Sequence, residues 1–124
     1  MRHRSRLDIF ASTISGNIAT VIRGGGVYFD ADTFTLSNST VSGNSASFGV
    51  GGGISVFEAH TVIVNSTVSD NSSIAGGGIR SYYSDLSLAN SIVSGNAASN
   101  NDSEIKKVAG SLTTSFNVLG DASR

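Results

Sequence analysis

Apolar and polar residues alternate along this chain, and glycine and asparagine interrupt the alternation at regular intervals. Phe34 and Leu36, for example, alternate with Thr35 and Ser37. A period of two residues is typical of strands that bury one face, and no stretch shows the 3.6-residue period of a helix. The pattern therefore predicts an all-β protein made of short strands.

The same pattern recurs along the chain. The hexapeptide Ser39–Asn44 (STVSGN) has close copies that begin at residues 12, 66 and 91, so the steps are 27, 27 and 25 residues. A glycine triplet at 24–26, 51–53 and 76–78 keeps step, and its last glycine always precedes the next hexapeptide by 13 positions. The spacing from each hexapeptide to the next triplet varies instead. Self-similarity at such a period is the signature of a solenoid.

Each repeat has room for three short strands, which we place near residues 27–30, 34–37 and 40–43 in the second repeat. Parallel pairing of each strand with its copy in the next repeat satisfies the backbone and stacks equivalent side chains about 4.8 Å apart. The step is too short for a propeller blade, and leucine-rich or ankyrin repeats would need a helical period. The expected fold is therefore a parallel β-helix, a solenoid of about four coils with three short strands per coil.

Two columns of asparagine keep the same step, and we expect both to form structural ladders at corners of the coil. Asparagine tolerates the left-handed backbone of a tight corner, and its amide can bond to the copies above and below it. The glycine triplets mark another corner, where side chains would clash or φ must be positive. The two columns are Asn38, Asn65 and Asn90, and Asn17, Asn44, Asn71 and Asn96.

The whole chain, residues 1–124, is expected to form one β-helical segment with atypical ends. Residues 1–6 are a basic lead, residues 7–100 are the repeat coils, and residues 101–124 are an atypical C-terminal coil or cap. Such a segment would cover the open strand edges at the C-terminal end, whereas the first coil has no comparable cover. We therefore expect the apolar side chains of the first coil to be partly exposed, and the chain either to self-associate through this coil or to be only marginally stable alone.

Composition excludes several classes of function. Lys and Arg number 8 against 9 Asp and Glu, so the formal net charge of −1 provides no basic field for nucleic acid. The absence of cysteine excludes disulfides and thiolate chemistry. No apolar run reaches the roughly 18 residues of a membrane span, and none follows the basic start as a signal peptide requires, so no direct membrane insertion is expected. The chain is then either cytosolic or, the interpretation that we favour, part of a longer exported protein that is extracellular or at the cell surface.

The repeat sequence, GGGI followed by alternating hydrophobic residues and NSTVSGN, resembles the right-handed parallel β-helix repeats of large bacterial surface proteins. It is similar to the repeats of polymorphic outer-membrane proteins, with their GGAI and FxxN motifs, and to the secreted choice-of-anchor β-helix proteins. The segment Phe116–Asp121 (FNVLGD) resembles the closing segment of the second group. The resemblance covers roughly residues 7–121 and implies a right-handed coil. It implies little about function, because such proteins range from adhesins to polysaccharide lyases.

The acidic residues are scattered, and three of them are the candidates for catalysis. Asp30 and Asp32 are two residues apart, and Glu58 lies one coil further on at an offset position. A glycosidase needs two carboxylates at a set separation, and a calcium site needs several converging oxygens. Solvated loop acids are the simpler interpretation, and His60 in the same region has no second ligand. We expect no metal and no cofactor, with calcium only if the protein is a lyase.

An outward-facing column of aromatic residues is the better candidate for a binding site. Val27 and Phe29 are expected to point inward, so that Tyr28 and its copies in the next coils point outward. Aromatic faces along a rigid surface can stack on sugar rings, but the same rings can also merely shield the sheet. The candidate ligand-binding residues are Tyr28, Phe57, Arg80, Tyr82 and Tyr83.

A third surface carries small hydroxyl residues. Thr13, Thr40 and Thr67 are expected to face outward, each followed at the second position by serine. A Thr-x-Ser array that repeats every ~4.8 Å is similar to those of ice-binding solenoids. Ile92 interrupts the column, and the preference of threonine for strands explains it equally well.

These observations favour a non-enzymatic β-helical segment of a bacterial surface or secreted protein, which acts as an adhesive stalk or as a module that binds carbohydrate or protein. Its partner would be a polysaccharide or a ligand on a host or other cell surface. The alternative is a carbohydrate-active enzyme of the β-helix type, a polysaccharide lyase or glycoside hydrolase that is incomplete in this chain. An ice-binding solenoid is a more remote alternative.

Overall fold

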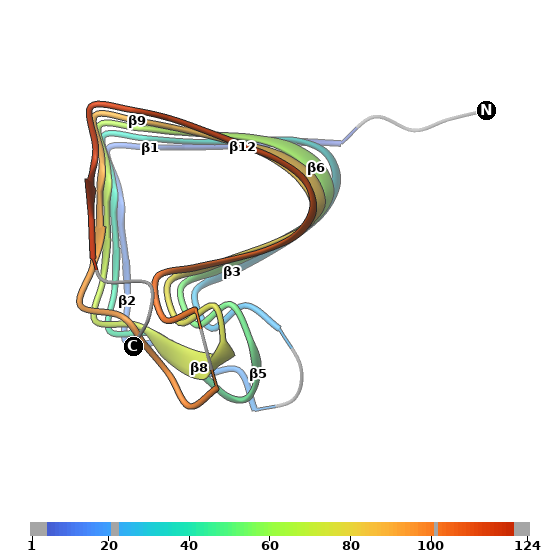
Figure 1. Cartoon of the computed structure of the whole chain (residues 1–124). Helices are drawn as coiled ribbons and strands as arrows, with labels where there is room; N and C mark the ends of the chain where they lie inside the picture. The colour runs from blue at the N-terminus through green and yellow to red at the C-terminus, as the bar shows by residue number, and fades with distance from the viewer. Residues whose placement is uncertain (1–4, 21–22, 101, 121–124) are drawn as a thin grey trace.

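The computed structural model describes residues 5–20, 23–100 and 102–120. The chain winds about four times around one axis as a parallel β-helix, and successive coils nearly superpose in a view along that axis (Figure 1). The regular structure in these residues is all strand, as the sequence predicts. They contain no helix that could cross a bilayer. Most of the basic lead and Asp121 lie outside the described residues.

The coils build three parallel sheets, which occupy three sides of the cross-section (Figure 1). Sheet A, the longest, contains β1 (Arg6–Phe10), β3 (Val27–Ser37), β6 (Ile54–Val64), β9 (Ile79–Ala89) and β12 (Ile105–Ser115). Sheet B contains β2 (Thr13–Ser15), β4 (Thr40–Ser42), β7 (Thr67–Ser69), β10 (Ile92–Ser94) and β13 (Val118–Leu119). Sheet C contains β5 (Ser45–Val50), β8 (Ser72–Ala75) and β11 (Ala97–Ala98).

The division of each coil into strands differs from the prediction. The segments 27–30 and 34–37 belong to one bent strand, β3, because its pairing with β6 continues on both sides of the bend. A single left-handed residue turns the strand in the next two coils: Glu58 and Tyr83 each have φ of 50°. Such a bulge bends a strand without ending its ladder, so the alternation alone does not reveal it. Sheet C was not predicted, since its strand β5 (SASFGV) has little apolar alternation.

The interior is filled by apolar side chains that stack from coil to coil. Leu36, Ile63 and Leu88 lie in register in one inward column, as predicted, and each is at most 1% exposed. Burial of a side chain of this size contributes about 1.5–3 kcal/mol. The apolar residues of the first coil, including Leu7 and Ile9, are only partly buried. Closure of the core therefore depends on neighbouring coils.

A ladder of asparagine side chains runs through the interior beside the apolar columns. The backbone N–H and the Nδ2 of Asn44 both donate to Oδ1 of Asn71, at 2.9 and 3.0 Å. Asn71 donates in the same way to Asn96, and its Nδ2 also donates to the Val41 carbonyl oxygen in the preceding coil. Asn17 begins the ladder by donating to Asn44. Each internal amide therefore bonds to the coil before it and the coil after it.

The glycine triplets make room for this ladder. Gly51 begins its triplet with φ of 67°, a backbone conformation that glycine adopts without strain. A Cβ atom on Gly53 would lie 2.9 Å from Nδ2 of Asn71, and one on Gly52 would run into the Ser72 and Gly77 carbonyl oxygens. The triplet is therefore required by close approach of the next coil as well as by backbone conformation.

At the corner between sheets A and B we expected asparagine side chains to form a ladder. The serines that directly follow those asparagines form it instead. The backbone N–H of Ser39 donates to Oγ of Ser66, and that of Ser66 donates to Oγ of Ser91, each at 3.1 Å. Asn65 has the expected left-handed backbone, as do its copies in the column, with φ between 48° and 51°. The side chains of Asn38, Asn65 and Asn90 are nevertheless exposed and make no hydrogen bond within the described residues. The left-handed residue faces solvent, and the serine after it faces inward.

Longer side chains end both ladders in the last coil. Glu104 occupies the position of Gly78, and its carboxylate accepts hydrogen bonds from the backbone N–H and the Nδ2 of Asn96, at 3.0 and 2.8 Å. Asn117 ends the serine ladder, because its Oδ1 accepts the Ser91 N–H at 2.9 Å. β12 and β13 continue sheets A and B, so residues 105–119 form a further coil and do not fold across the end.

Replacing the ladder amide at position 71 tests this account of the interior. In Asn71→Ala the buried N–H and Nδ2 of Asn44 lose their acceptor, and each buried polar group without a partner costs about 1–3 kcal/mol. We expect the free energy of unfolding, measured by urea denaturation, to fall by at least about 2 kcal/mol. Asn65→Gly is the matched control, and because glycine suits φ of 51° at this exposed corner it should change stability little. Equal losses in the two variants would contradict the assignment.

Candidate functional site

The outer face of sheet A carries the candidate binding site, which we call the aromatic patch. Register places its members in adjacent columns, since Tyr28 aligns with Ser55 and Arg80, and Phe57 aligns with Tyr82. Tyr83, at the bend of β9, belongs to the next column, and Arg23 contacts Tyr28 from the segment before β3. The patch comprises Arg23, Tyr28, Phe57, Arg80, Tyr82 and Tyr83.

Three of the four rings of the patch are in direct contact. Phe57 and Tyr82 stack across neighbouring coils, with centroids 5.1 Å apart and planes inclined by 16°. Tyr83 meets Tyr82 edge-on, at 4.5 Å and 84°. Tyr83 is 55% exposed and Tyr28 is 40% exposed, whereas Phe57 and Tyr82 are half-buried. Two rings fixed by the sheet thus support an outer ring that faces solvent.

Two arginines lie over these rings. The guanidinium of Arg23 is 5.5 Å from the centroid of Tyr28 and 5.9 Å from that of Phe57, and one of its terminal nitrogens donates to the Tyr28 hydroxyl at 3.1 Å. The guanidinium of Arg80 lies 4.3 Å from the centroid of Tyr82. Such cation–π contacts hold each cation against the sheet without neutralising it.

The pKa of Arg80 depends on its burial and on the charged and aromatic groups around it. Burial lowers the pKa of Arg80 from its ordinary value, and the positive charge of Arg23 lowers it further, while Tyr82 and Tyr28 act in the opposite direction. A guanidinium remains protonated at any physiological pH despite such a shift. The patch therefore presents two neighbouring positive charges among aromatic rings.

The sequence pointed to five of the six patch residues but missed Arg23. The five lie in or beside strand columns that the repeat alignment makes visible. Arg23 precedes the glycine triplet, where the length of the repeat varies. Its backbone forms an isolated bridge with Val50, and its side chain reaches Tyr28 and Phe57. No periodic signal marks that position.

The candidate catalytic acids are divided by the bend in sheet A. Asp30 lies in register with Phe57, on the side of the aromatic patch, and is exposed. Asp32 and Glu58 line a pocket of about 600 Å³ on the outside of the bend, together with His60 and Asp85. We call these four residues the acidic groove. Asp30 and Asp32 are only two residues apart in the sequence, but they therefore do not belong to the same site.

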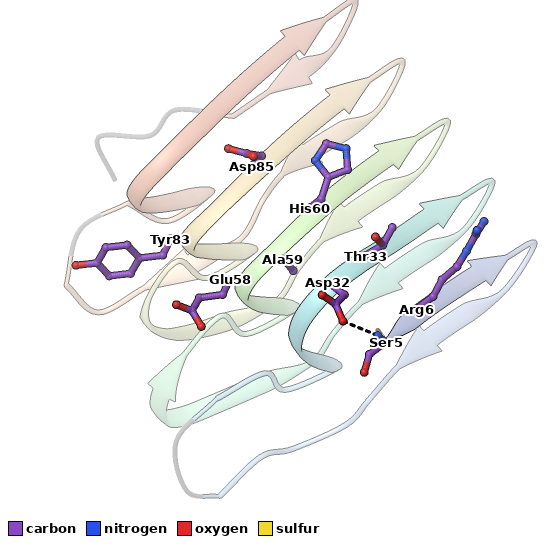
Figure 2. Close-up of a pocket in the computed structure, with 9 residues that line it drawn as sticks. All are labelled: Ser5, Arg6, Asp32, Thr33, Glu58, Ala59, His60, Tyr83 and Asp85. Atoms are coloured by element: carbon purple, nitrogen blue, oxygen red, sulfur yellow. Dashed lines mark hydrogen bonds between the residues drawn. The ribbon is translucent and has the colours of Figure 1, made fainter. Parts of the chain in front are cut away.

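The acidic groove gathers charged side chains without bringing them to one point. Figure 2 shows them spread over successive coils, with Tyr83 and Glu58 at one side of the pocket and His60 toward the other. Asp32 accepts a hydrogen bond from the Ser5 N–H at 2.6 Å, and Asp85 accepts one from the Ser111 hydroxyl at 2.8 Å. In the described part of the chain, no three His, Asp or Glu residues are placed to hold a metal ion.

The outer face of sheet B carries the threonine column. Thr13, Thr40 and Thr67 align in register, and Ile92 and then Val118 continue the column. The strands of this sheet are two or three residues long, so the regular hydroxyl array covers three coils only. The structure adds no feature to this face beyond those that the sequence shows.

No family model, no curated protein and no solved structure matches this chain. The case for a function therefore rests on the chain's own surfaces, and of these the aromatic patch has the most defined geometry.

Calcium addition tests the acidic groove. A calcium site of ordinary extracellular affinity, with Kd of about 10⁻⁴ to 10⁻³ M, would stabilise the fold by roughly 1–2 kcal/mol at about 5 mM calcium. Because no three ligands converge in the described residues, we expect the melting temperature of chelator-treated protein to change by less than about 1 °C. A rise of several degrees that is lost in Asp32→Asn would show that the groove binds calcium.

Proposed function

We propose that this protein is a non-enzymatic binding module whose aromatic patch stacks on the sugar rings of a polysaccharide. The observation that supports this proposal is the continuous contact from Phe57 through Tyr82 to the exposed Tyr83. Exposed aromatic rings offer a flat apolar face for a sugar and a polar edge for its hydroxyl groups. The net charge of −1 and the absence of cysteine are compatible with such a role outside the cell.

The rigidity of the support favours binding. Phe57 and Tyr82 belong to β6 and β9, which pair in register on both sides of the bend. A surface held in its bound geometry loses little conformational entropy when a ligand binds, so more of the contact energy appears as affinity. A long polysaccharide could also lie along several coils, because the sheet presents equivalent positions in each coil.

The setting that we propose is a bacterial surface or secreted protein in which this β-helix is a segment of an adhesive stalk. The GGGI and NSTVSGN repeats support this setting through their resemblance to polymorphic outer-membrane and choice-of-anchor repeats. The parallel coil agrees with that resemblance at the level of fold. Membership of either family and the extracellular location are part of the proposal.

The acidic groove supports a second candidate function, a glycoside hydrolase or polysaccharide lyase. The supporting observation is the pocket that brings Asp32, Glu58 and Asp85 together with His60. Acid and base catalysis of glycoside cleavage needs two carboxylates that flank one bond. We rank this candidate second because the side chains are spread over successive coils (Figure 2).

A pair of glycine substitutions separates the two candidates. Tyr83 and Glu58 occupy the left-handed position of the bend in neighbouring coils, both with φ of 50°, so glycine should relieve strain equally at each. We expect Tyr83→Gly to weaken binding to a polysaccharide identified on a glycan array by about tenfold, as the loss of an aromatic contact at a binding hot spot does. Glu58→Gly should leave that affinity unchanged, and both variants should fold as stably as the parent protein.

The opposite pattern would contradict the proposal. Reducing-end release from a polysaccharide by the parent protein, if it is lost in Glu58→Gly, would assign the function to the acidic groove. Failure of the parent protein to bind any glycan on the array would remove the proposed function altogether.

A further inference from the structure

The two arginines of the aromatic patch have no carboxylate partner among the described residues. Arg6 pairs with Asp8 and Lys106 pairs with Asp102, but neither Arg23 nor Arg80 forms an ion pair within that part of the chain. Their contacts are with aromatic rings instead. Two adjacent cations without a counter-ion repel each other, so an anion placed between them would stabilise the arrangement.

The hydrogen-bonding capacity of these arginines is also largely unused. A guanidinium carries five N–H donors in a planar fork that matches a carboxylate or sulfate group. Arg23 uses one terminal nitrogen to bond the Tyr28 hydroxyl, and within the described residues Arg80 makes no hydrogen bond. The remaining donors are available to a ligand at the rim of the patch.

The charges around the patch define where an anion is favoured. Lys106 lies in register with Arg80 on the outer side, although Asp102 neutralises it at 3.1 Å. Asp30 lies in register with Phe57 and is exposed without pairing to either arginine. The cationic region is therefore confined to Arg23 and Arg80, directly above Tyr28, Phe57 and Tyr82.

We infer that the patch selects acidic glycans, in which a carboxylate or sulfate group on the sugar pairs with Arg23 and Arg80 while the ring stacks on the aromatic side chains. This inference rests on the proposed function and names its ligand class. Hydrogen bonds to charged groups are stronger than neutral ones, so an acidic sugar gains affinity over its neutral counterpart. The gain is electrostatic and decreases as salt increases.

The test compares an acidic hexasaccharide of uronic acid residues with its carboxyl-reduced form, which keeps the linkages and loses the charges. By isothermal titration calorimetry, we expect the parent protein to bind the acidic form about tenfold more tightly, and the difference to shrink at high salt. Arg23→Gln should abolish the preference, through a loss of about tenfold in the affinity for the acidic form. Arg80→Gln should do the same. A sulfated hexasaccharide shows whether sulfate replaces the carboxylate.

Two controls keep the outcomes distinct. Arg6→Gln removes an exposed arginine that is already paired with Asp8, and it should not alter either affinity. Arg23 is exposed, so its variant should fold normally even if the half-buried Arg80 is needed for stability.

Equal binding of both hexasaccharides, with no effect of Arg23→Gln, would overturn the inference and leave the proposed function intact. Absence of binding to either form in the parent protein would count against the proposed function itself. Tighter binding of a single-stranded oligonucleotide than of the acidic hexasaccharide would overturn selection for sugars.

Discussion

The hydrogen bonds that asparagine and serine side chains accept from the neighbouring coil are the interaction on which this structure depends. Asn44, Asn71 and Asn96 each accept two hydrogen bonds from the coil before them. In the serine ladder, Ser66 and Ser91 each accept one from the backbone of the preceding coil. Because these groups are buried, a shift of register by one residue would leave amides and hydroxyls without partners, at about 1–3 kcal/mol each. Apolar columns such as Leu36, Ile63 and Leu88 give the interior its burial energy, and they oppose the same shift, because a slip by one residue would move each column to the solvent face.

The fixed register determines what appears on the outside. Every inward column is flanked by an outward one, so the positions of Phe57 and Tyr82 follow from the stacking of the residues beside them in β6 and β9. Tyr83, the left-handed residue at the bend of β9, packs against Tyr82 and also lines the pocket of the acidic groove, so it lies where the aromatic patch meets that groove. The arrangement of side chains on the outer face of sheet A is thus a consequence of the register inside.

The repeat spacing predicted the parallel coil, the inward column through Ile63 and the outward position of Tyr28, because each depends on a period that the sequence displays. Features without a period were not accessible. The continuity of β3 across its bend depends on one left-handed residue per coil, and Arg23 reaches the patch from a segment of variable length. The serine ladder could not be predicted for another reason. Asn65 and Ser66 are both polar and adjacent at the corner, and only the structure shows that Ser66 is the one that faces inward. Glu104 as the end of the asparagine ladder likewise depends on a contact across eight residues that no pattern encodes.

Amide hydrogen exchange, followed residue by residue by NMR, tests the central role of the ladders most directly. The backbone N–H groups of Asn44 and Asn71 have side-chain oxygens of the next coil as their acceptors, Asn71 Oδ1 and Asn96 Oδ1. If the ladders hold the coils in register, these two amides should exchange only through global unfolding, as slowly as the amide of the buried Ile63 in sheet A. Exchange of both amides at the rate of the exposed corners, while Ile63 remains protected, would show that the ladder bonds open independently of the fold and would contradict the account.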